Sequence, residues 1–560
     1  MSPSRSTTTT TTSATTRRTS SRQPARVAFV GAGPGDSGLM TVRALEFLAA
    51  ADAVVIDQVA REDVVARYCR EGVEVVDAGH GDHGQPLTHA MRAKLVVKAA
   101  KAAGASAGAT GGPASGGLVV RLMDGDPATF NGLAEEALAC HKAGIAFDIV
   151  PGVSAVSAVP AYAGIPLTSS SSPAVHVISA NDRAVDWAAS VADSVTVVLL
   201  GPPQDLAGAL AKLLEAGRSP ESPVALTENG TTIRQRTRVT TLGEVATVMK
   251  TVEFPALAVV GSTVALRDNL SWFETKPLFG WNVLVPRTKE QSGSTIARLE
   301  SYGAMAEVVP TISVEPPRTP QQMERAVKGL VTGRYEWIGF TSVNAVKAIR
   351  EKFEEFGLDA RAFAGLKIAA VGGVTAEALR EWGIVPDLVP SGEHSAQGLL
   401  ADWPPFDEVL DPINRVFLPR ADIATDTLVA GLQDMGWEVD DVTAYRTVRA
   451  APPAQPIREA IKGGQFDAAV FTSSSTVRNL VGIAGKPHPS TVIACIGPAT
   501  AKAAEEHGLR VDVLAPEASS DSLVDALADY GLGLATAATE AGEPVLRPSA
   551  KKASARRRAK

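Results

Sequence analysis

Carboxylates stand in this sequence where apolar runs end. Asp57 closes the run at 53–56, and the turn Asp124-Gly125-Asp126 follows the run at 118–123. In open α/β sheets, ligands bind at the carboxyl ends of the strands. Asp57 therefore suits a general base, because apolar flanks disfavour the charged form of a carboxyl group. The simpler alternative is a hydrated or helix-capping aspartate. No histidine or further acid lies at ligand spacing from the turn, so we expect no metal site.

The segment GAGPGD at 31–36 lies between an apolar run and a helical pattern, where phosphate-binding loops occur. The dinucleotide fingerprint G-x-G-x-x-G requires glycine where this chain has Asp36, whose carboxylate would repel a pyrophosphate. Pro34 also lacks the N–H that an anion needs. No G-x-x-x-x-G-K-[ST] motif occurs. The loop therefore suits a ligand without phosphates that approaches the backbone closely, or is simply a tight strand–helix turn.

The second half of the sequence contains an internal duplication. Residues 283–314 match residues 416–447 at an offset of 133, which places Arg287 on Arg420. Two further pairs of segments match in the same order, 337–349 with 468–480 and 370–384 with 495–509. Ordered matches at nearly constant offset predict two similar α/β lobes that face a shared cleft.

Hydroxyl residues stand before predicted helices in both copies of the duplication. The pairs Thr341-Ser342 and Thr472-Ser473 each follow an apolar run, and Thr375 and Thr500 have the same setting. Helix N-termini with hydroxyls and free N–H groups bind anions such as carboxylates. Each residue alone could be an ordinary helix cap. Four such helix starts facing one cleft suit a flexible ligand with many carboxylates.

The elements that position these residues alternate between strand and helix. Apolar runs lie at 27–30, 53–56, 73–76, 118–123 and 147–150. Helical patterns lie at 39–50 and 88–103, with a flexible loop of small residues at 103–117. Further apolar runs begin near residue 174, and 233–242 alternates like an exposed strand or hairpin. This alternation predicts an α/β fold with largely parallel sheets.

Charge is unevenly distributed over the 560 residues, whose formal net charge is −7. Residues 1–24 carry four arginines and no acid, and 545–560 carry seven basic residues and no acid, so the stretch between them carries −18. This acidic body argues against nucleic acid as the main partner. The three cysteines are far apart, so we expect a reducing, cytoplasmic environment. No apolar run is long enough for a membrane span.

Residues 26–275 resemble the tetrapyrrole methylases, above all uroporphyrinogen-III C-methyltransferase. The resemblance rests on VAFVGAGPGD, VVRLMDGDPATF, IVPGVSAVSAVPAYAGIPLT and PVALTENGTTIRQR. It implies a two-domain fold that binds S-adenosylmethionine between the domains, usually in a homodimer. It also implies that Asp57 accepts a proton. His80 aligns with a family lysine taken as proton donor, and Gln58 with a family arginine. The implied cofactor contacts are Pro34, Asp124, Gly125, Asp126, Thr129, Ser154, Ala155, Leu200 and Gly230.

Residues 281–530 resemble uroporphyrinogen-III synthase. The resemblance rests on PRTKEQSGSTIARLESYGAMAEVVPTISVEP, FTSVNAVKAI, VTAYRT, FTSSSTVRNL and IGPATAKAAEEHGL. It implies cyclisation of hydroxymethylbilane without a cofactor. Tyr445 matches a tyrosine proposed to assist loss of the bilane hydroxyl, and its alternative role is packing at the hinge. The implied and inferred substrate contacts are Arg287, Thr341, Ser342, Thr375, Arg420, Thr472, Ser473 and Thr500.

The expected domains follow from these resemblances. They are a disordered tail at 1–24, a methylase at 25–275, a synthase at 281–530 and a basic disordered tail at 531–560. The methylase divides into 25–170 and 171–275. The synthase divides into one lobe of 281–315 with 446–530 and a second lobe of 316–445.

The expected function is bifunctional, with formation of uroporphyrinogen III followed by its methylation to precorrin-2. Three alternatives stay open at the level of the sequence. The first is a synthase whose N-terminal half only binds S-adenosylmethionine or a tetrapyrrole. The second is a non-catalytic tetrapyrrole carrier, and the third is a nicotinamide oxidoreductase.

Overall fold

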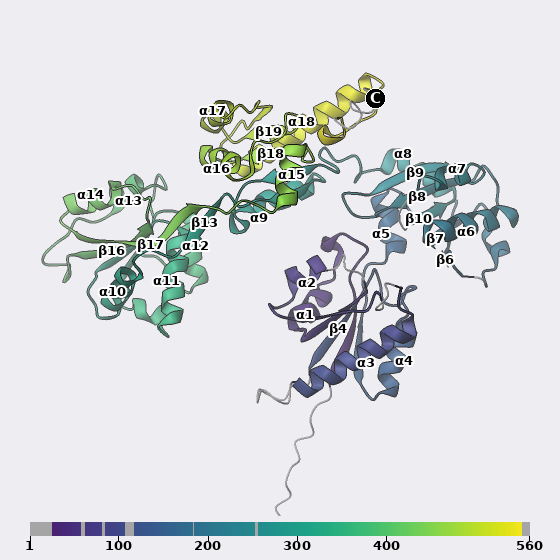
Figure 1. Ribbon diagram of the computed structural model, residues 1–560, viewed down its shortest axis with the longest axis horizontal. Coiled ribbons are helices and arrows are strands. Elements are labelled where there is room, and N and C mark those ends of the chain that lie inside the picture. Colours follow the sequence, from purple (N-terminus) through teal and green to yellow (C-terminus); the bar gives the residue numbers. More distant parts are fainter. Residues whose placement is uncertain are drawn as a thin grey trace, which may run out of the picture. The chain divides into compact units, whose positions relative to one another are not determined.

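The computed structural model describes residues 25–57, 62–80, 85–106, 117–182, 184–252 and 256–551. The chain forms two compact units that divide after Phe279, and each unit contains two five-stranded sheets (Figure 1). The expected tail at 1–24 and Gln58 lie outside the described residues, as does most of the expected loop at 103–117. Within the described ranges, no helix combines the length and apolarity that a membrane span requires.

The first sheet is entirely parallel, with strand order β3-β2-β4-β1-β5. Its strands are β1 (Arg26–Gly31), β2 (Ala53–Ile56), β3 (Glu74–Asp77), β4 (Leu118–Met123) and β5 (Ala146–Val150). Its helices are η1 (Ser37–Leu39), α1 (Val42–Ala50), α2 (Glu62–Tyr68), α3 (His89–Ser106), α4 (Leu133–Lys142) and α5 (Ala155–Tyr162). Because all five strands run the same way, every loop after a strand emerges at one edge of this sheet.

The second sheet is mixed, with strand order β6-β7-β10-β8-β9. Its strands are β6 (Ala174–Ser179), β7 (Val195–Gly201), β8 (Pro223–Glu228), β9 (Arg236–Thr241) and β10 (Ala256–Val260). The helices are η3 (Trp187–Ser190), α6 (Pro203–Glu215), α7 (Val245–Met249), η4 (Ser262–Leu266) and α8 (Arg267–Leu270). Only β6 and β7 pair in parallel, so the prediction of largely parallel sheets is wrong for this part. The predicted exposed strand at 233–242 is confirmed as β9.

The third sheet has the order β12-β11-β18-β19-β20 and is parallel. Its strands are β11 (Asn282–Val285), β12 (Met305–Val308), β18 (Ala468–Phe471), β19 (Val492–Cys495) and β20 (Val513–Leu514). The helices are α9 (Lys289–Ser301), α15 (Gln455–Gly463), α16 (Ser474–Ala484), α17 (Pro498–Glu506) and α18 (Ser520–Glu540). Segments from both ends of the second unit therefore share one sheet.

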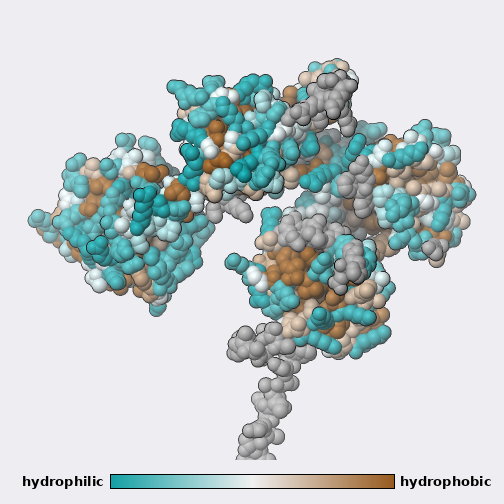
Figure 2. Space-filling model, viewed as in Figure 1, coloured by the Kyte–Doolittle hydropathy of each residue, from teal (hydrophilic) through white to brown (hydrophobic). Residues whose placement is uncertain are grey.

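The fourth sheet has the order β13-β17-β16-β14-β15. Its strands are β13 (Ile312–Glu315), β14 (Trp337–Phe340), β15 (Lys367–Ala370), β16 (Arg415–Ala421) and β17 (Glu438–Arg449). The helices are α10 (Pro320–Val331), α11 (Val343–Glu355), η5 (Ala360–Phe363), α12 (Gly373–Glu381), α13 (Ala396–Asp402) and α14 (Thr427–Asp434). Residues 312–315, expected in the other lobe, pair antiparallel with β17 in this sheet. On the face shown in Figure 2, hydrophilic residues cover most of this lobe.

The expected disordered tail at 531–560 is wrong for its described part. Helix α18 continues to Glu540, and Gly531 is buried within it. Beyond the helix, the Ser549 N–H donates to Asp467 Oδ1 at 2.8 Å. Asp467 is fully buried, and its Oδ2 accepts the N–H of Asn282 at 2.8 Å. The segment after α18 is thus fixed to the first strand of the second unit by a buried carboxylate that needs both donors.

Candidate functional site

Three loops at the carboxyl edge of the first sheet are in direct backbone contact. The N–H of Gly33 donates to the carbonyl of Gly125 at 3.2 Å, and the N–H of Gly125 donates to the carbonyl of Gly33 at 2.9 Å. A Cβ on Gly31 would lie 2.6 Å from Gly125 O and from Gly152 Cα. Only glycine fits at this approach, so the loops after β1, β4 and β5 converge on one point.

The carboxylate of Asp126 fixes these loops. It accepts the N–H of Gly152 at 3.0 Å and the N–H of Ala128 at 2.9 Å. Ser154 caps α5 by accepting the N–H of Val156 at 3.2 Å. The predicted cofactor residues of the two loops therefore lie together, and Asp126 and Ser154 also have internal bonding roles.

The part of the first unit that contains the second sheet also contacts these loops, through the turn after β8. The N–H of Asp36 donates to Thr231 Oγ1 at 3.1 Å, and the hydroxyl of Tyr162 donates to the Asp36 carboxylate at 2.7 Å. A Cβ on Gly35 would lie 3.0 Å from the carbonyl of Gly230. Thr231 has φ +65°, a backbone strain that recurs at ligand sites. Pro34 and Gly230 are thereby brought to one place.

The remaining predicted cofactor residues border this convergence. Asn131 Nδ2 donates to the carbonyls of Asp124 and Asp126, both at 2.6 Å. The hydroxyl of Thr129 lies 3.4 Å from Asp126 Oδ1. Leu200 and Ala155 pack against one apolar cluster.

The groups that converge here are peptide groups, hydroxyls and carboxylates. Such a set fits a ligand with positive charge and no phosphate. A sulfonium cofactor such as S-adenosylmethionine has that chemistry.

Asp57 lies at the end of β2 between two arginines. Its Oδ2 is 3.0 Å from Arg121 Nη2 and 3.3 Å from Arg92 Nη1. The run before Asp57 is apolar and buried as expected, but the carboxylate itself is ion-paired. Arg121 is fully buried and also forms two hydrogen bonds with Glu136, at 2.8 and 3.2 Å. Burial alone would lower the pKa of Arg121, but Glu136 and Asp57 raise it overall.

Arg92 is the site residue that the sequence reasoning missed. It comes from α3, its Nε donates to the carbonyl of Ala78 at 3.1 Å, and its side chain is 18% exposed. No recognisable motif surrounds it. His80 is exposed in the loop after β3, where its neighbour Gly79 packs on the backbone of Asp57. The two described cations beside Asp57 thus come from helix α3 and strand β4.

Tyr445 in the second unit is buried and hydrogen-bonded to a predicted substrate residue. Its hydroxyl lies 2.8 Å from Ser342 Oγ, which caps α11 by accepting the N–H of Ala345 at 3.2 Å. The β16–β17 register shifts so that Ala421 pairs with Tyr445. Such a bulge re-aims side chains near active sites. Thr341 precedes Ser342 in the same turn, so this cluster joins β17 to the start of α11.

Arg420 does not have the free charge expected of a substrate contact. Its Nε lies 2.8 Å from Asp441 Oδ1, its Nη2 binds Asp441 Oδ2, and its Nη1 donates to the carbonyl of Thr425 at 2.6 Å. The residue is 4% exposed. Asp441 neutralises Arg420 within the protein, so Arg420 has no free charge to offer a substrate carboxylate.

Arg287 lines a pocket of about 190 Å³ that is formed by the loops after β11 and β18 and by the start of β13. The lining residues are Pro286, Arg287, Thr288, Thr311, Ile312, Thr472, Ser473, Ser475 and Thr476. Arg287 Nη1 donates to Ser520 Oγ at 3.3 Å. Burial lowers the pKa of Arg287. Ser473 caps α16 by accepting the N–H of Thr476 at 3.3 Å.

Thr375 and Thr500 lie elsewhere. Both are buried in the first turns of α12 and α17, at 6% and 4% exposure, and neither lines this pocket. Their burial favours a packing role for the side chains over direct contact with a ligand.

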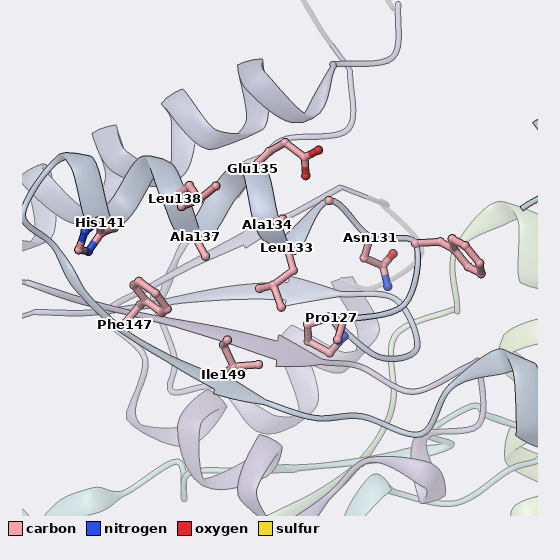
Figure 3. A pocket seen from close by; sticks show the side chains of 13 residues that line it. Pro127, Asn131, Leu133, Ala134, Glu135, Ala137, Leu138, His141, Phe147 and Ile149 are labelled. Carbon is pink, nitrogen blue, oxygen red and sulfur yellow. The ribbon is translucent and has the colours of Figure 1, made fainter. Parts of the chain in front are cut away.

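Another cavity, of about 460 Å³, lies between α4 and β5 (Figure 3). Leu138, Phe147 and Ile149 line it, and it contains none of the predicted site residues. Within the described residues, no three acidic, histidine or cysteine side chains gather as metal ligands.

The comparisons with known proteins match both units. The family model described as tetrapyrrole (corrin/porphyrin) methylases matches residues 26–246, and that described as uroporphyrinogen-III synthase HemD matches residues 293–525. The porphyrin biosynthesis protein HemD of Ruminiclostridium josui is 31% identical over 519 residues, which are 90% of this chain and 98% of that protein. The chain belongs to this family of fused proteins. It consists of an N-terminal tetrapyrrole methylase and a C-terminal uroporphyrinogen-III synthase.

Other relatives match the methylase half alone. The siroheme synthase of Tolumonas auensis is 38% identical over 258 residues, covering 44% of this chain and about half of that protein's length. The uroporphyrin-III C-methyltransferase of Thermus thermophilus, in complex with S-adenosylhomocysteine, is 29% identical, with a TM-score of 0.35. It aligns with 43% of this chain and 99% of that one.

The Arg121–Glu136 pair generates a stability prediction. The substitution Glu136→Ala leaves the buried guanidinium without its main partner, which costs about 3–5 kcal/mol of the free energy of unfolding. Urea denaturation of the full chain measures this loss. Glu135→Ala is the matched control, because Glu135 is exposed on the same helix and its loss should cost less than about 0.5 kcal/mol. Equal effects of the two substitutions would contradict the burial argument.

Proposed function

We propose that this protein closes hydroxymethylbilane to uroporphyrinogen III in its second unit and methylates that product in its first. The observation that carries the proposal is the match of one chain to both family models. One family is named for making uroporphyrinogen III, and the other for methylating tetrapyrroles. Methylation at C2 and C7 gives precorrin-2.

In the second unit, Tyr445 protonates the leaving hydroxyl of the bilane. Water then departs, leaving an azafulvene-like cation, and ring closure with inversion of ring D proceeds through a spiro intermediate. The proton is returned when the closing pyrrole carbon loses its hydrogen. Ser342 holds the Tyr445 hydroxyl at 2.8 Å, and helix-start donors hold the carboxylate arms. Positioning therefore supplies most of the catalysis.

In the first unit, bound S-adenosylmethionine would supply an electrophilic methyl group on a sulfonium sulfur. Gly31 and Gly152 let the loops after β1, β4 and β5 meet, and these loops would hold the cofactor. Asp57 accepts the proton that the tetrapyrrole releases when it is methylated. Arg92 and Arg121 hold Asp57 as an oriented carboxylate. The contacts inferred from the resemblance, from Pro34 to Gly230, remain part of this proposal.

Purified full-length protein tests this function directly. Incubation with hydroxymethylbilane and methyl-labelled S-adenosylmethionine should yield type-III macrocycle carrying two labelled methyl groups. Type-III product without label would leave only the synthase function. Binding of tetrapyrrole with no type-III isomer above spontaneous type-I closure would leave a carrier.

Arg92 generates a prediction for methyl transfer. The substitution Arg92→Met removes the partly exposed cation beside Asp57, and methyl transfer should fall about tenfold or more. Type-III formation should be unchanged. Arg92→Lys should retain part of the rate, since it keeps the charge but not the planar fork. Arg43→Met is the control, because Arg43 pairs with Glu46 on the exposed face of α1. Equal rates in Arg92→Met and wild type would refute a role for Arg92.

Ser342 generates a prediction for the synthase. The substitution Ser342→Ala removes both the partner of Tyr445 and a helix cap, and kcat for type-III formation should fall about tenfold. Loss of the cap alone costs about 1 kcal/mol of stability. Ser395→Ala controls for this, because Ser395 caps α13 in the same lobe by accepting the N–H of Gly398. Ser342→Thr should restore the rate. A comparable fall in kcat for Ser395→Ala would show that capping alone explains the effect.

A further inference from the structure

The two lobes of the second unit carry equivalent positions in equivalent register. In the third sheet, Val285 of β11 pairs with Val308 of β12. In the fourth sheet, Leu418 of β16 pairs with Asp441 of β17. The offset of 133 relates the members of both pairs, and an arginine follows two residues later in each case. Val308 therefore occupies the position that Asp441 has in the other lobe.

The arginines at these positions have opposite surroundings. Asp441 holds Arg420 through both carboxylate oxygens, and the residue is buried. Val308 offers no charge to Arg287. Among the described side chains, which exclude those of residues 289–291, no carboxylate lies within ion-pair distance of Arg287. The two copies of the duplication therefore share the arginine but not the acid.

Other residues of the pocket also differ from their equivalents in the other lobe. Ile312 stands where the other lobe has Tyr445, and Thr472-Ser473 stand where it has Thr341-Ser342. The Tyr445 hydroxyl contacts Ser342 in the fourth-sheet lobe. Ile312 cannot make that bond, and the residues that line the space of about 190 Å³ beside it include Arg287 and several hydroxyl side chains. The N-terminal peptide groups of α16 border the same space.

We propose that this pocket binds one carboxylate of the substrate, an acetate or propionate arm, while the equivalent face of the other lobe carries the reacting tyrosine. The inference rests on the proposed synthase function. A partly buried cation, hydroxyl donors and helix-end N–H groups are the partners of a carboxylate. One half-site thus anchors the substrate, and the other carries the reacting tyrosine.

The test introduces an acid at position 308, where the other lobe has Asp441. The substitution Val308→Asp places a carboxylate at the register position from which Asp441 holds Arg420, so Arg287 becomes internally neutralised. The KM for hydroxymethylbilane should rise about tenfold or more, with kcat little changed. Val308→Asn is the matched control of equal size without charge and should resemble wild type. Arg287→Met should raise KM similarly and add nothing further in combination with Val308→Asp.

A binding measurement separates this inference from the proposed function. Fluorescence titration of the full-length chain with uroporphyrin III, an octacarboxylate, needs no turnover. Weaker binding by Val308→Asp than by Val308→Asn supports the proposed binding of a carboxylate in this pocket. That conclusion would stand even if the wild type formed no type-III isomer, a result that would refute only the proposed synthase function. Equal affinity of the two variants and wild type, with unchanged KM where turnover occurs, would overturn the anchor.

Discussion

An acidic protein that binds a polycarboxylate must place its cations where the ligand carboxylates arrive. Residues 25–544 carry a net charge of −18, and the proposed substrates carry eight carboxylates. Screening limits the attraction of distant charges to about 8–10 Å at physiological salt. Binding therefore depends on single arginines in the walls of the sites, and on which of them are already neutralised.

The structure divides these arginines into two kinds. Arg121 and Arg420 are buried and paired with Glu136 and Asp441, so their charge organises the protein itself. A buried pair costs desolvation, and its value lies in fixing neighbouring groups. Arg121 fixes Asp57 in this way. Arg92 lies beside Asp57 with part of its side chain exposed, and Arg287 lines a pocket. In each unit, the proposed chemistry therefore depends on one partly accessible arginine, Arg92 or Arg287, beside side chains that a buried ion pair holds in place.

The alternating pattern predicted the α/β class and placed Asp57 and the 124–126 turn at strand ends, because apolar runs mark buried strands. It did not predict strand direction, which depends on connections, and so the antiparallel pairs of the second sheet were missed. It also missed Arg92, because a helical arginine has no local signal for the carboxylate that it meets. The Arg420–Asp441 ion pair could be predicted only with knowledge of how β16 and β17 pair. Helix α18 beyond residue 530 lacks a clear apolar stripe, so its continuation was not predicted.

The central claim is that two separate sites on one chain carry out successive reactions. The most direct test measures type-III formation and methyl transfer to supplied uroporphyrinogen III in two single variants of the full-length protein. Tyr445→Phe should lower only the first rate, and Asp57→Asn only the second. Loss of both activities in either variant, with the fold retained by circular dichroism, would contradict the account.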